Sequence, residues 1–478
     1  MSKWSAEGGS LDFAALRPLY GNGALRPSGM VRILLDRISR RGDDSVWIFR
    51  EPEENLLGRA GELESLAEGL SGEALFGRYP LYGLPFAIKD NIDWEDRPTT
   101  AACPEYAYVP EKTAPTVERL LHAGAILMGK TNLDQFATGL VGVRSPYGVP
   151  RNPFDERYIP GGSSSGSAVA VSAGLVSFAL GTDTAGSGRV PAGFNNIVGL
   201  KPTRGLVSMS GVVPACRSLD CVSVFALTVP DALEALRVMA EEDEADPFSR
   251  PVPPEWKEKP PADLAGGIWV GVPCKDQQEF FGNEDAAELF NSAIDRLRMM
   301  GMGVVEIDYT FFHETARLVY EGPWMAERYS AIREFFDAKP EALHPVTRKL
   351  IAKGRGYSAS DAFEGIYRLE GLKKITGKTW NDIDMLVVPT TGTVYSIAEV
   401  ESDPIALNNH LSFYTNFMNL LDLCGLAVPN VFYANGLPAC VTFIAPALQE
   451  SGLCALGAAF QRESGLNLGA TPHPITAE

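Results

Sequence analysis

Histidine is scarce in this sequence, and its cysteines form no recognisable motif. The five histidines are scattered along 478 residues with no HxH or HExxH pattern, so a zinc site is not expected. The seven cysteines are odd in number and include no CxxC pair, which argues against a disulfide scaffold. We expect neither a cofactor nor a metal.

Positive charge is also in short supply. Lysine and arginine number 42 against 60 aspartates and glutamates, giving a net charge of −18. Binding to nucleic acid or to an anionic membrane needs a basic field, and this chain has the opposite sign. An anionic small-molecule substrate would therefore need a local arginine or lysine.

Long hydrophobic runs are missing as well. The opening residues contain no apolar core of a signal peptide, and the longest weakly polar run, 168–181, carries Ser172 and Ser177 and is about half a membrane span. We expect a cytoplasmic protein without a membrane partner. The composition, 45% hydrophobic and 21% charged with 47 glycines and 34 prolines, suits a turn-rich α/β enzyme.

Helical and strand patterns alternate along the chain, which predicts an α/β fold. A helix and a short strand are expected in 28–50, a charged helix over 51–73, and a strand in 79–93 that leads into Lys89. A match to the phosphate-binding pattern GxxxxGK[ST] at 124–131 is rejected, because its middle residues, Ala-Ile-Leu-Met, favour a buried strand. The remaining expected helices are 114–123, 284–300, 323–337, 341–353 and 358–376, and the remaining expected strands are 125–132, 304–309 and 385–391.

A serine-rich segment is the most informative part of the sequence. Residues 161–167 read GGSSSGS, and Ser187 follows Ser163 by 24 positions in the segment DTAGSGRVP. A flexible linker is the alternative, but small residues continue through an apolar helix and a second tight turn, where backbones must approach closely.

The chemistry of these serines needs a base. Serine is a weak nucleophile until a neighbour takes its proton, and no histidine lies in these motifs. A lysine can serve if burial lowers its pKa, and Lys89 ends an apolar strand. The alternative is that Lys89 forms a buried ion pair with Asp90 or Asp183.

These motifs resemble the amidase signature family, whose pattern is matched by Lys89-Asp90-Asn91, GGSS-G-S and GTD-GS-R-P. Further matches lie at 129–139, 151–155, 199–205 and 387–391. The resemblance implies a single α/β domain over 1–465, a large mixed twisted β-sheet covered by helices on both faces. Its helical N-terminal part would span about 1–75, and 466–478, which has little core character, would be a C-terminal tail or truncated linker.

The resemblance also implies the roles of the residues. Ser187 would attack the carbonyl, and Ser163 would relay its proton to Lys89. A cis peptide bond is implied between Gly162 and Ser163, and Asp183 with Arg189 is expected to brace the loop. The oxyanion hole would be formed by the backbone N–H groups of Thr184, Ala185, Gly186 and Ser187.

Segments 185–189 and 203–221 look like those of the allophanate hydrolases, as does the stretch around Tyr320. This likeness implies hydrolysis of the terminal amide of a small urea carboxylate, with release of ammonia. Arg328, in the second turn of a helix opened by Pro323, would hold the carboxylate, and Tyr320 the ureido group. The alternatives are an exposed Arg328 paired with Glu327 or Glu321, a core Tyr320, and Arg144 or Arg217 as the cation.

Other functions stay open at this point. A general amidase or an amidotransferase A-type subunit would keep Lys89, Ser163 and Ser187 and change the pocket. A catalytically inactive binding protein would be expected to have lost one of the three. The resemblance suggests a homodimer with the N-terminal helices as a candidate interface. Longer members of the family carry a further C-terminal domain that acts on the product, so the chain would be a truncated form or a natural single-domain member.

Overall fold

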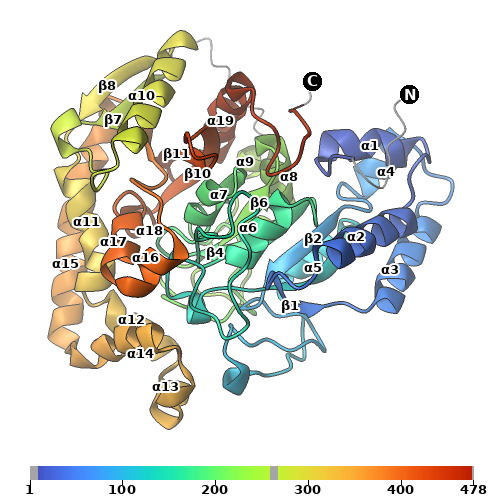
Figure 1. Ribbon diagram of the computed structural model, residues 1–478, viewed down its shortest axis with the longest axis horizontal. Helices are drawn as coiled ribbons and strands as arrows, with labels where there is room; N and C mark the ends of the chain where they lie inside the picture. Colours follow the sequence, from blue (N-terminus) through green and yellow to red (C-terminus); the bar gives the residue numbers. More distant parts are fainter. Residues whose placement is uncertain (1–8, 259–266, 476–478) are drawn as a thin grey trace.

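The computed structural model describes residues 9–258 and 267–475, and these residues form one mixed sheet of eleven strands (Figure 1). The strands are β1 (Trp47–Arg50), β2 (Pro85–Lys89), β3 (Ile126–Thr131), β4 (Phe178–Asp183), β5 (Val198–Lys201), β6 (Cys221–Ala226), β7 (Trp269–Pro273), β8 (Gly303–Ile307), β9 (Met385–Pro389), β10 (Leu423–Phe432) and β11 (Pro438–Pro446). Their order is β1-β3-β2-β4-β6-β5-β10-β11-β9-β7-β8. The prediction of a large mixed α/β sheet is confirmed.

Helices cover both faces of this sheet. They are α1 (Phe13–Gly21), α2 (Pro27–Arg41), α3 (Glu53–Leu66), α4 (Glu73–Arg78), α5 (Pro115–His122), α6 (Ser165–Ser172), α7 (Val190–Phe194), α8 (Val229–Met239), α9 (Pro254–Glu258), α10 (Glu284–Met299), α11 (Thr310–Glu321), α12 (Trp324–Ala331), α13 (Arg333–Ala338), α14 (Pro345–Ala352), α15 (Ala359–Thr376), α16 (Ile397–Ser402), α17 (Ala406–Leu411), α18 (Phe417–Leu420) and α19 (Glu450–Ser464). None of the described helices is long and apolar enough to cross a membrane.

Two predicted helices differ from the structure. The charged helix expected over 51–73 ends at Leu66, because Gly69 and Gly72 follow with φ of 80° and 53°, values that favour glycine. The helix expected over 323–337 is two helices, α12 and α13, separated by Ile332 with φ −128° and ψ 24°. These breaks depend on single backbone angles, which an apolar pattern does not encode.

Two neighbouring strands in the interior of the sheet bring motif residues together at their carboxyl ends. β2 and β4 are parallel neighbours, with Phe86 beside Phe178 and Ile88 beside Leu180. Both strands are buried along their whole length, as apolar strands covered on two faces should be. Lys89 and Asp183 are the last residues of these two parallel strands, so both lie at the same end of the strand pair.

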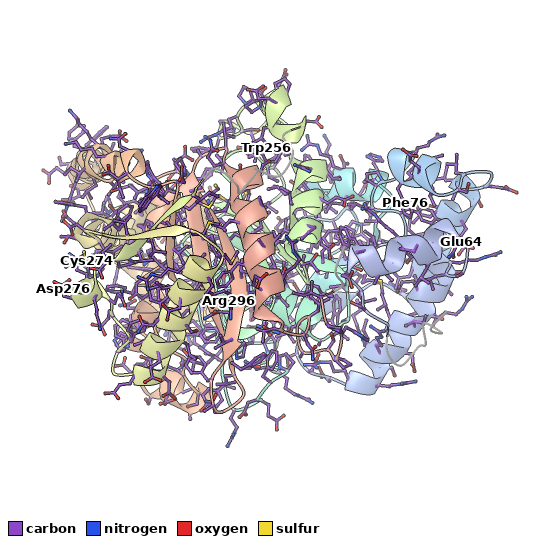
Figure 2. All side chains as sticks on the ribbon, turned by 90° about the horizontal axis from the view of Figure 1, so that it is seen from above. Glu64, Phe76, Trp256, Cys274, Asp276 and Arg296 are labelled. Carbon is purple, nitrogen blue, oxygen red and sulfur yellow. The ribbon has the colours of Figure 1, made fainter. Side chains whose placement is uncertain are left out.

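Helix α10 packs beside α19 on the C-terminal half of the sheet, as the region around Arg296 shows in Figure 2. The Arg296 guanidinium lies 4.7 Å from the ring centre of Phe460 in α19. It also donates to Asn430 in β10, at 2.9 Å from Nη1 to Oδ1. One side chain thus links two helices to the longest strand, and of these three elements only α10 was predicted.

Both ends of the described chain join the main domain. β1, in the N-terminal part, pairs with β3. In the segment expected to have little core character, Leu468 is 1% exposed and belongs to the main core. The Ala470 N–H donates to Ser172 O at 2.9 Å. That expectation was wrong for Leu468, because one buried leucine is enough to anchor a polar segment.

Candidate active site

Lys89 is fully buried at the end of β2 and contacts two hydroxyl groups. Its Nζ lies 2.8 Å from Ser163 Oγ and 2.8 Å from Thr182 Oγ1. Ser163 precedes α6, and the peptide bond between Gly162 and Ser163 is cis, as expected. The structure therefore brings together two of the three residues assigned to the catalytic group, and it adds Thr182 from the matched GTD motif.

The two acids proposed as partners of Lys89 are both paired with other cations. Lys130 Nζ lies 3.2 Å from Asp90 Oδ1, and Arg189 Nε lies 2.9 Å from Asp183 Oδ2. Among the described residues, Lys89 forms no ion pair, so that alternative was wrong. The cause is local: Lys130 is the penultimate residue of the neighbouring strand β3 and lies within ion-pair distance of Asp90.

Burial lowers the pKa of the Lys89 ammonium to about 7, although the charges of Asp134, Asp220 and Asp183 oppose this shift. A buried ammonium loses its hydration, which penalises the charged form. A large fraction of Lys89 is thus neutral near pH 7, and a neutral amine can accept a proton from a hydroxyl group.

The loop after β4 carries Ser187 and is braced by Asp183. The Asp183 carboxylate accepts the N–H groups of Gly186 at 2.8 Å and Gly188 at 2.9 Å. It also binds the Arg189 guanidinium twice, at 2.9 Å and 3.0 Å. Burial alone would raise the pKa of Asp183, but Arg189 lowers it below the usual value. The brace predicted for this pair is confirmed.

One of the four predicted oxyanion-hole donors is already engaged. The Gly186 N–H points to Asp183, so in this conformation it cannot donate to a substrate oxygen. Glycine is required here for another reason. Gly186 has φ of 134°, and a Cβ atom would lie 2.6 Å from Thr415 Oγ1. The prediction that the Gly186 N–H belongs to the oxyanion hole is therefore corrected. Because Gly186 has no side chain, Thr415 can lie close to this loop.

Ser187 itself is 4% exposed. Within the described ranges, its hydroxyl makes no hydrogen bond to another residue. The contact between Ser163 and Ser187 that a proton relay needs stays a prediction. The N–H groups of Thr184, Ala185 and Ser187 also stay predicted donors.

Residues far away in sequence hold this loop from its other side. Thr415 Oγ1 donates to Ala185 O at 2.7 Å, and Asn419 Nδ2 donates to Asp183 O at 2.8 Å. Thr184 Oγ1 donates to Asp220, and burial raises the pKa of Asp220 to about 6. Sequence reasoning missed Thr415, Asn419 and the role of Asp220, because no local pattern marks a contact between segments so far apart.

Arg328 is a buried cation with no carboxylate partner in the described ranges. It is 2% exposed and lies in the second turn of α12. Its Nη1 donates to Thr138 Oγ1 at 3.0 Å and to Ala137 O at 3.3 Å. Among the described residues it forms no ion pair, and its Nε has no hydrogen-bond partner. A buried charge without a counter-ion is costly, so this guanidinium is suited to an anionic ligand.

The exposed ion pair considered for Arg328 was wrong. Glu327 accepts instead from the Ser218 N–H and hydroxyl, each at 2.7 Å, and Glu321 pairs with Arg317 at 2.6 Å. Tyr320 is half-buried and packs partly against a hydrophobic cluster. The Arg328 guanidinium lies 5.7 Å from the Tyr320 ring centre.

Arg144 and Arg217, the two other candidate cations for the substrate carboxylate, differ in burial. Arg144 is buried, and its Nη1 donates to Thr138 O at 3.0 Å, so it shares Thr138 with Arg328. Arg217 is exposed and lies over the Phe248 ring at 5.7 Å. Two buried guanidinium groups thus meet at Thr138, and Arg217 is not one of them.

A cavity of about 340 Å³ lies beside Tyr320. Ser412, Phe413 and Asn416 line it, and Asn416 Oδ1 is buried without a hydrogen-bond partner. The same segment contacts the Ser187 loop through Thr415. The segment 412–416 therefore connects this cavity with the nucleophile loop.

Lys89 is buried and hydrogen-bonded to Ser163, and the loop after β4 carries a second serine, Ser187. This arrangement defines an amidase-type site. The family model described as Amidase matches residues 36–454. The chain belongs to this family.

Particular relatives are similar over most of the chain. The urea amidolyase of Saccharomyces cerevisiae is 44% identical over 430 residues, which cover 89% of this chain and 23% of that protein. A solved structure of Kluyveromyces lactis allophanate hydrolase has 39% identity and a TM-score of 0.89, covering 99% of this chain and 76% of that chain. A glutamyl-tRNA(Gln) amidotransferase polypeptide from Chloroflexus aggregans is 34% identical, covering 80% of this chain and 83% of that protein. The chain spans about a quarter of the length of the curated urea amidolyases that it matches.

Proposed function

We propose that this chain hydrolyses the terminal amide of allophanate and releases ammonia. The observation that carries the proposal is the buried Arg328, which has no ion-pair partner among the described residues and lies beside Tyr320. Allophanate is a small anionic amide, so its carboxylate would supply the missing counter-charge. The similarity to a Kluyveromyces lactis allophanate hydrolase supports the same substrate.

The reaction begins with Ser187. Its Oγ attacks the carbonyl carbon of the terminal amide, while its proton passes through Ser163 to neutral Lys89. The contact of 2.8 Å between Lys89 Nζ and Ser163 Oγ supports the second half of this relay. The negative charge that develops on the carbonyl oxygen is stabilised by the N–H groups of Thr184, Ala185 and Ser187.

The proton then returns from Lys89 through Ser163 to the leaving nitrogen, and the C–N bond breaks to release ammonia. A water molecule then attacks the acyl carbon on Ser187 while Lys89 takes its proton, the bond from the acyl carbon to Ser187 Oγ breaks, and Lys89 returns the proton through Ser163 to Ser187 Oγ. The products are N-carboxycarbamate and free Ser187. No step requires a metal or cofactor.

Arg328 binds the substrate carboxylate, and its planar guanidinium suits this geometry. Tyr320 hydrogen-bonds the ureido portion, and the unpartnered Asn416 Oδ1 accepts a substrate N–H. A homodimer and a place in urea degradation belong to the same proposal, and the names of the relatives support the latter. A cytoplasmic location stays a prediction from the sequence.

A panel of amides tests the proposal. Ammonia release is measured with allophanate, biuret, malonamate, simple aliphatic amides and glutamine. We expect allophanate to have the highest kcat/KM. A preference for neutral amides would favour a general amidase. A preference for glutamine would favour an amidotransferase role, which the similarity to the Chloroflexus aggregans protein allows.

A further inference from the structure

The cavity beside Tyr320 carries an unpaired positive charge at its mouth. Three charged side chains line this cavity of about 340 Å³: Arg317, Glu321 and Lys353. Arg317 and Glu321 pair with each other at 2.6 Å, so their charges cancel. Lys353 is exposed and forms no ion pair with any described residue. The net charge of the lining is therefore positive, and Lys353 supplies it.

His313 adds little charge to this lining near pH 7. It lines the same cavity, and its ring centre lies 4.4 Å from that of Phe413. Burial, together with the neighbouring Arg317 guanidinium, lowers the pKa of the His313 imidazole below its ordinary value. A neutral imidazole leaves Lys353 as the uncompensated charge among the described residues that line the cavity.

The inner end of the cavity adjoins the candidate active site. Tyr320 lines the cavity, and the centre of its ring lies 5.7 Å from the Arg328 guanidinium. Asn416 also lines it, is 4% exposed, and has an Oδ1 with no hydrogen-bond partner among the described residues. A buried amide oxygen without a partner costs free energy, so this end of the cavity is suited to a polar ligand.

The backbone at Lys353 packs against α12, the helix that carries Arg328. Lys353 directly follows the last residue of α14, and α14 contacts α12. The next residue, Gly354, is buried, and a Cβ atom at its position would clash with Met325 O of α12. This close approach fixes the backbone of the exposed cation, Lys353, relative to the helix of the buried one, Arg328.

We propose that this cavity is the route by which the anionic amide reaches the active site, and that Lys353 at its mouth attracts the substrate carboxylate before Arg328 binds it. The whole chain carries a net charge of −18, which repels an anion, and a cation at the entrance offsets this repulsion locally. The inference rests on the proposed function and adds to it a residue that determines specificity from outside the buried site. Lys353 acts on the approach of the substrate and does not touch the reacting atoms.

Charge reversal tests the role of Lys353. Lys349 of α14 is the matched control, because it is exposed and forms no ion pair with a described residue but does not line the cavity. Lys353→Glu and Lys349→Glu change the net charge of the protein equally. At low salt we expect Lys353→Glu to lower kcat/KM for allophanate about three- to tenfold through a higher KM, with kcat unchanged. Lys349→Glu should change it by less than about twofold.

Salt and a neutral substrate separate attraction from a change in structure. Because salt screens exposed charges, the difference between the two variants should largely disappear in about 0.5 M sodium chloride. Both variants should hydrolyse an uncharged amide of the panel as fast as the unchanged protein does. Equal losses on allophanate in both variants would overturn the role of Lys353. So would a loss in Lys353→Glu that persists in high salt or extends to the uncharged amide.

Blocking the mouth tests the route with any substrate. Asn409 is exposed and lines the cavity. Asn409→Trp should lower kcat/KM at least about fivefold for every amide that the unchanged protein hydrolyses, whereas Asn409→Ala leaves the cavity open and should keep full activity. Full activity of Asn409→Trp, shown to be folded by thermal melting, would contradict the route. A preference of the unchanged protein for neutral amides would refute the proposed function and the role of Lys353, while the two Asn409 variants would still decide the route.

Discussion

Lys130 forms the ion pair with Asp90, and this contact leaves Lys89 without a carboxylate partner among the described residues. Both lysines are fully buried, and both lie at the ends of neighbouring parallel strands. Lys130 Nζ also donates to Pro98 O at 2.8 Å and to Thr99 Oγ1 at 2.7 Å. Within the described parts of the chain, Lys89 has only hydroxyl partners. Burial lowers the pKa of both ammonium groups, but Lys89 is the one that contacts the hydroxyl group of Ser163 and is placed to act as a base.

Activity should depend on the protonation of Lys89. Burial lowers its pKa to about 7, and only the neutral amine can accept a proton. We expect kcat/KM for allophanate to fall about tenfold per pH unit below pH 7 and to level off above it. Burial raises the pKa of Asp220 to about 6, so its titration would add a second, lower inflection. A kcat/KM that stays constant from about pH 8 to about pH 5.5 would contradict the role of Lys89.

Lys130→Met should destabilise the fold. It leaves Asp90 buried without its cation, and breaking a buried ion pair costs about 3–5 kcal/mol. Urea denaturation measures the change in the free energy of unfolding. Adding Asp90→Asn to this variant should recover part of the loss, since the remaining side chain then carries no charge. Equal stability of Lys130→Met and the unchanged protein would show that the pair contributes nothing.

Thr415→Val should slow catalysis by misplacing the nucleophile loop. The change removes the hydrogen bond from Thr415 Oγ1 to Ala185 O, a loss of about 0.5–1.5 kcal/mol. We expect kcat to fall about two- to tenfold with little change in KM, and Thr415→Ser to restore it. If KM rises and kcat is unchanged, Thr415 contributes to substrate binding instead of loop position.

Arg328→Ala should affect anionic substrates most. Loss of a charge-assisted hydrogen bond corresponds to about 1.5–3 kcal/mol, or about ten- to a hundredfold in kcat/KM. We expect this loss for allophanate and a much smaller one for an uncharged amide of similar size. Arg328→Lys keeps the positive charge without the planar guanidinium. Its kcat/KM for allophanate should lie between the values of Arg328→Ala and the unchanged protein. An equal loss of kcat/KM on both substrates would show that Arg328 has a structural role. Arg144 would then be the next candidate for binding the carboxylate.

The sequence predicts the local parts of this molecule well. Lys89, Ser163 and Ser187 stand in short motifs, and the strands that carry them are continuous apolar runs whose burial follows from their composition. Thr415 and Asn419 could not be found in this way, because they reach the loop from more than two hundred residues away. The predicted contact of Lys89 with Ser163 is confirmed. The sequence could not decide against the alternative ion pair, since the choice of Asp90 between Lys89 and Lys130 depends on side-chain geometry near the ends of two strands.

Allophanate turnover by Ser187→Ala, assayed as ammonia release beside the unchanged protein, tests most directly whether this chain works through a serine nucleophile served by a neutral lysine. We expect Ser187→Ala to lose at least about a thousandfold in kcat, and Lys89→Ala to come close to that value. The folded state of both variants is checked by thermal melting. Retention of about a tenth of the original turnover in Ser187→Ala would contradict the assignment of Ser187 as the nucleophile.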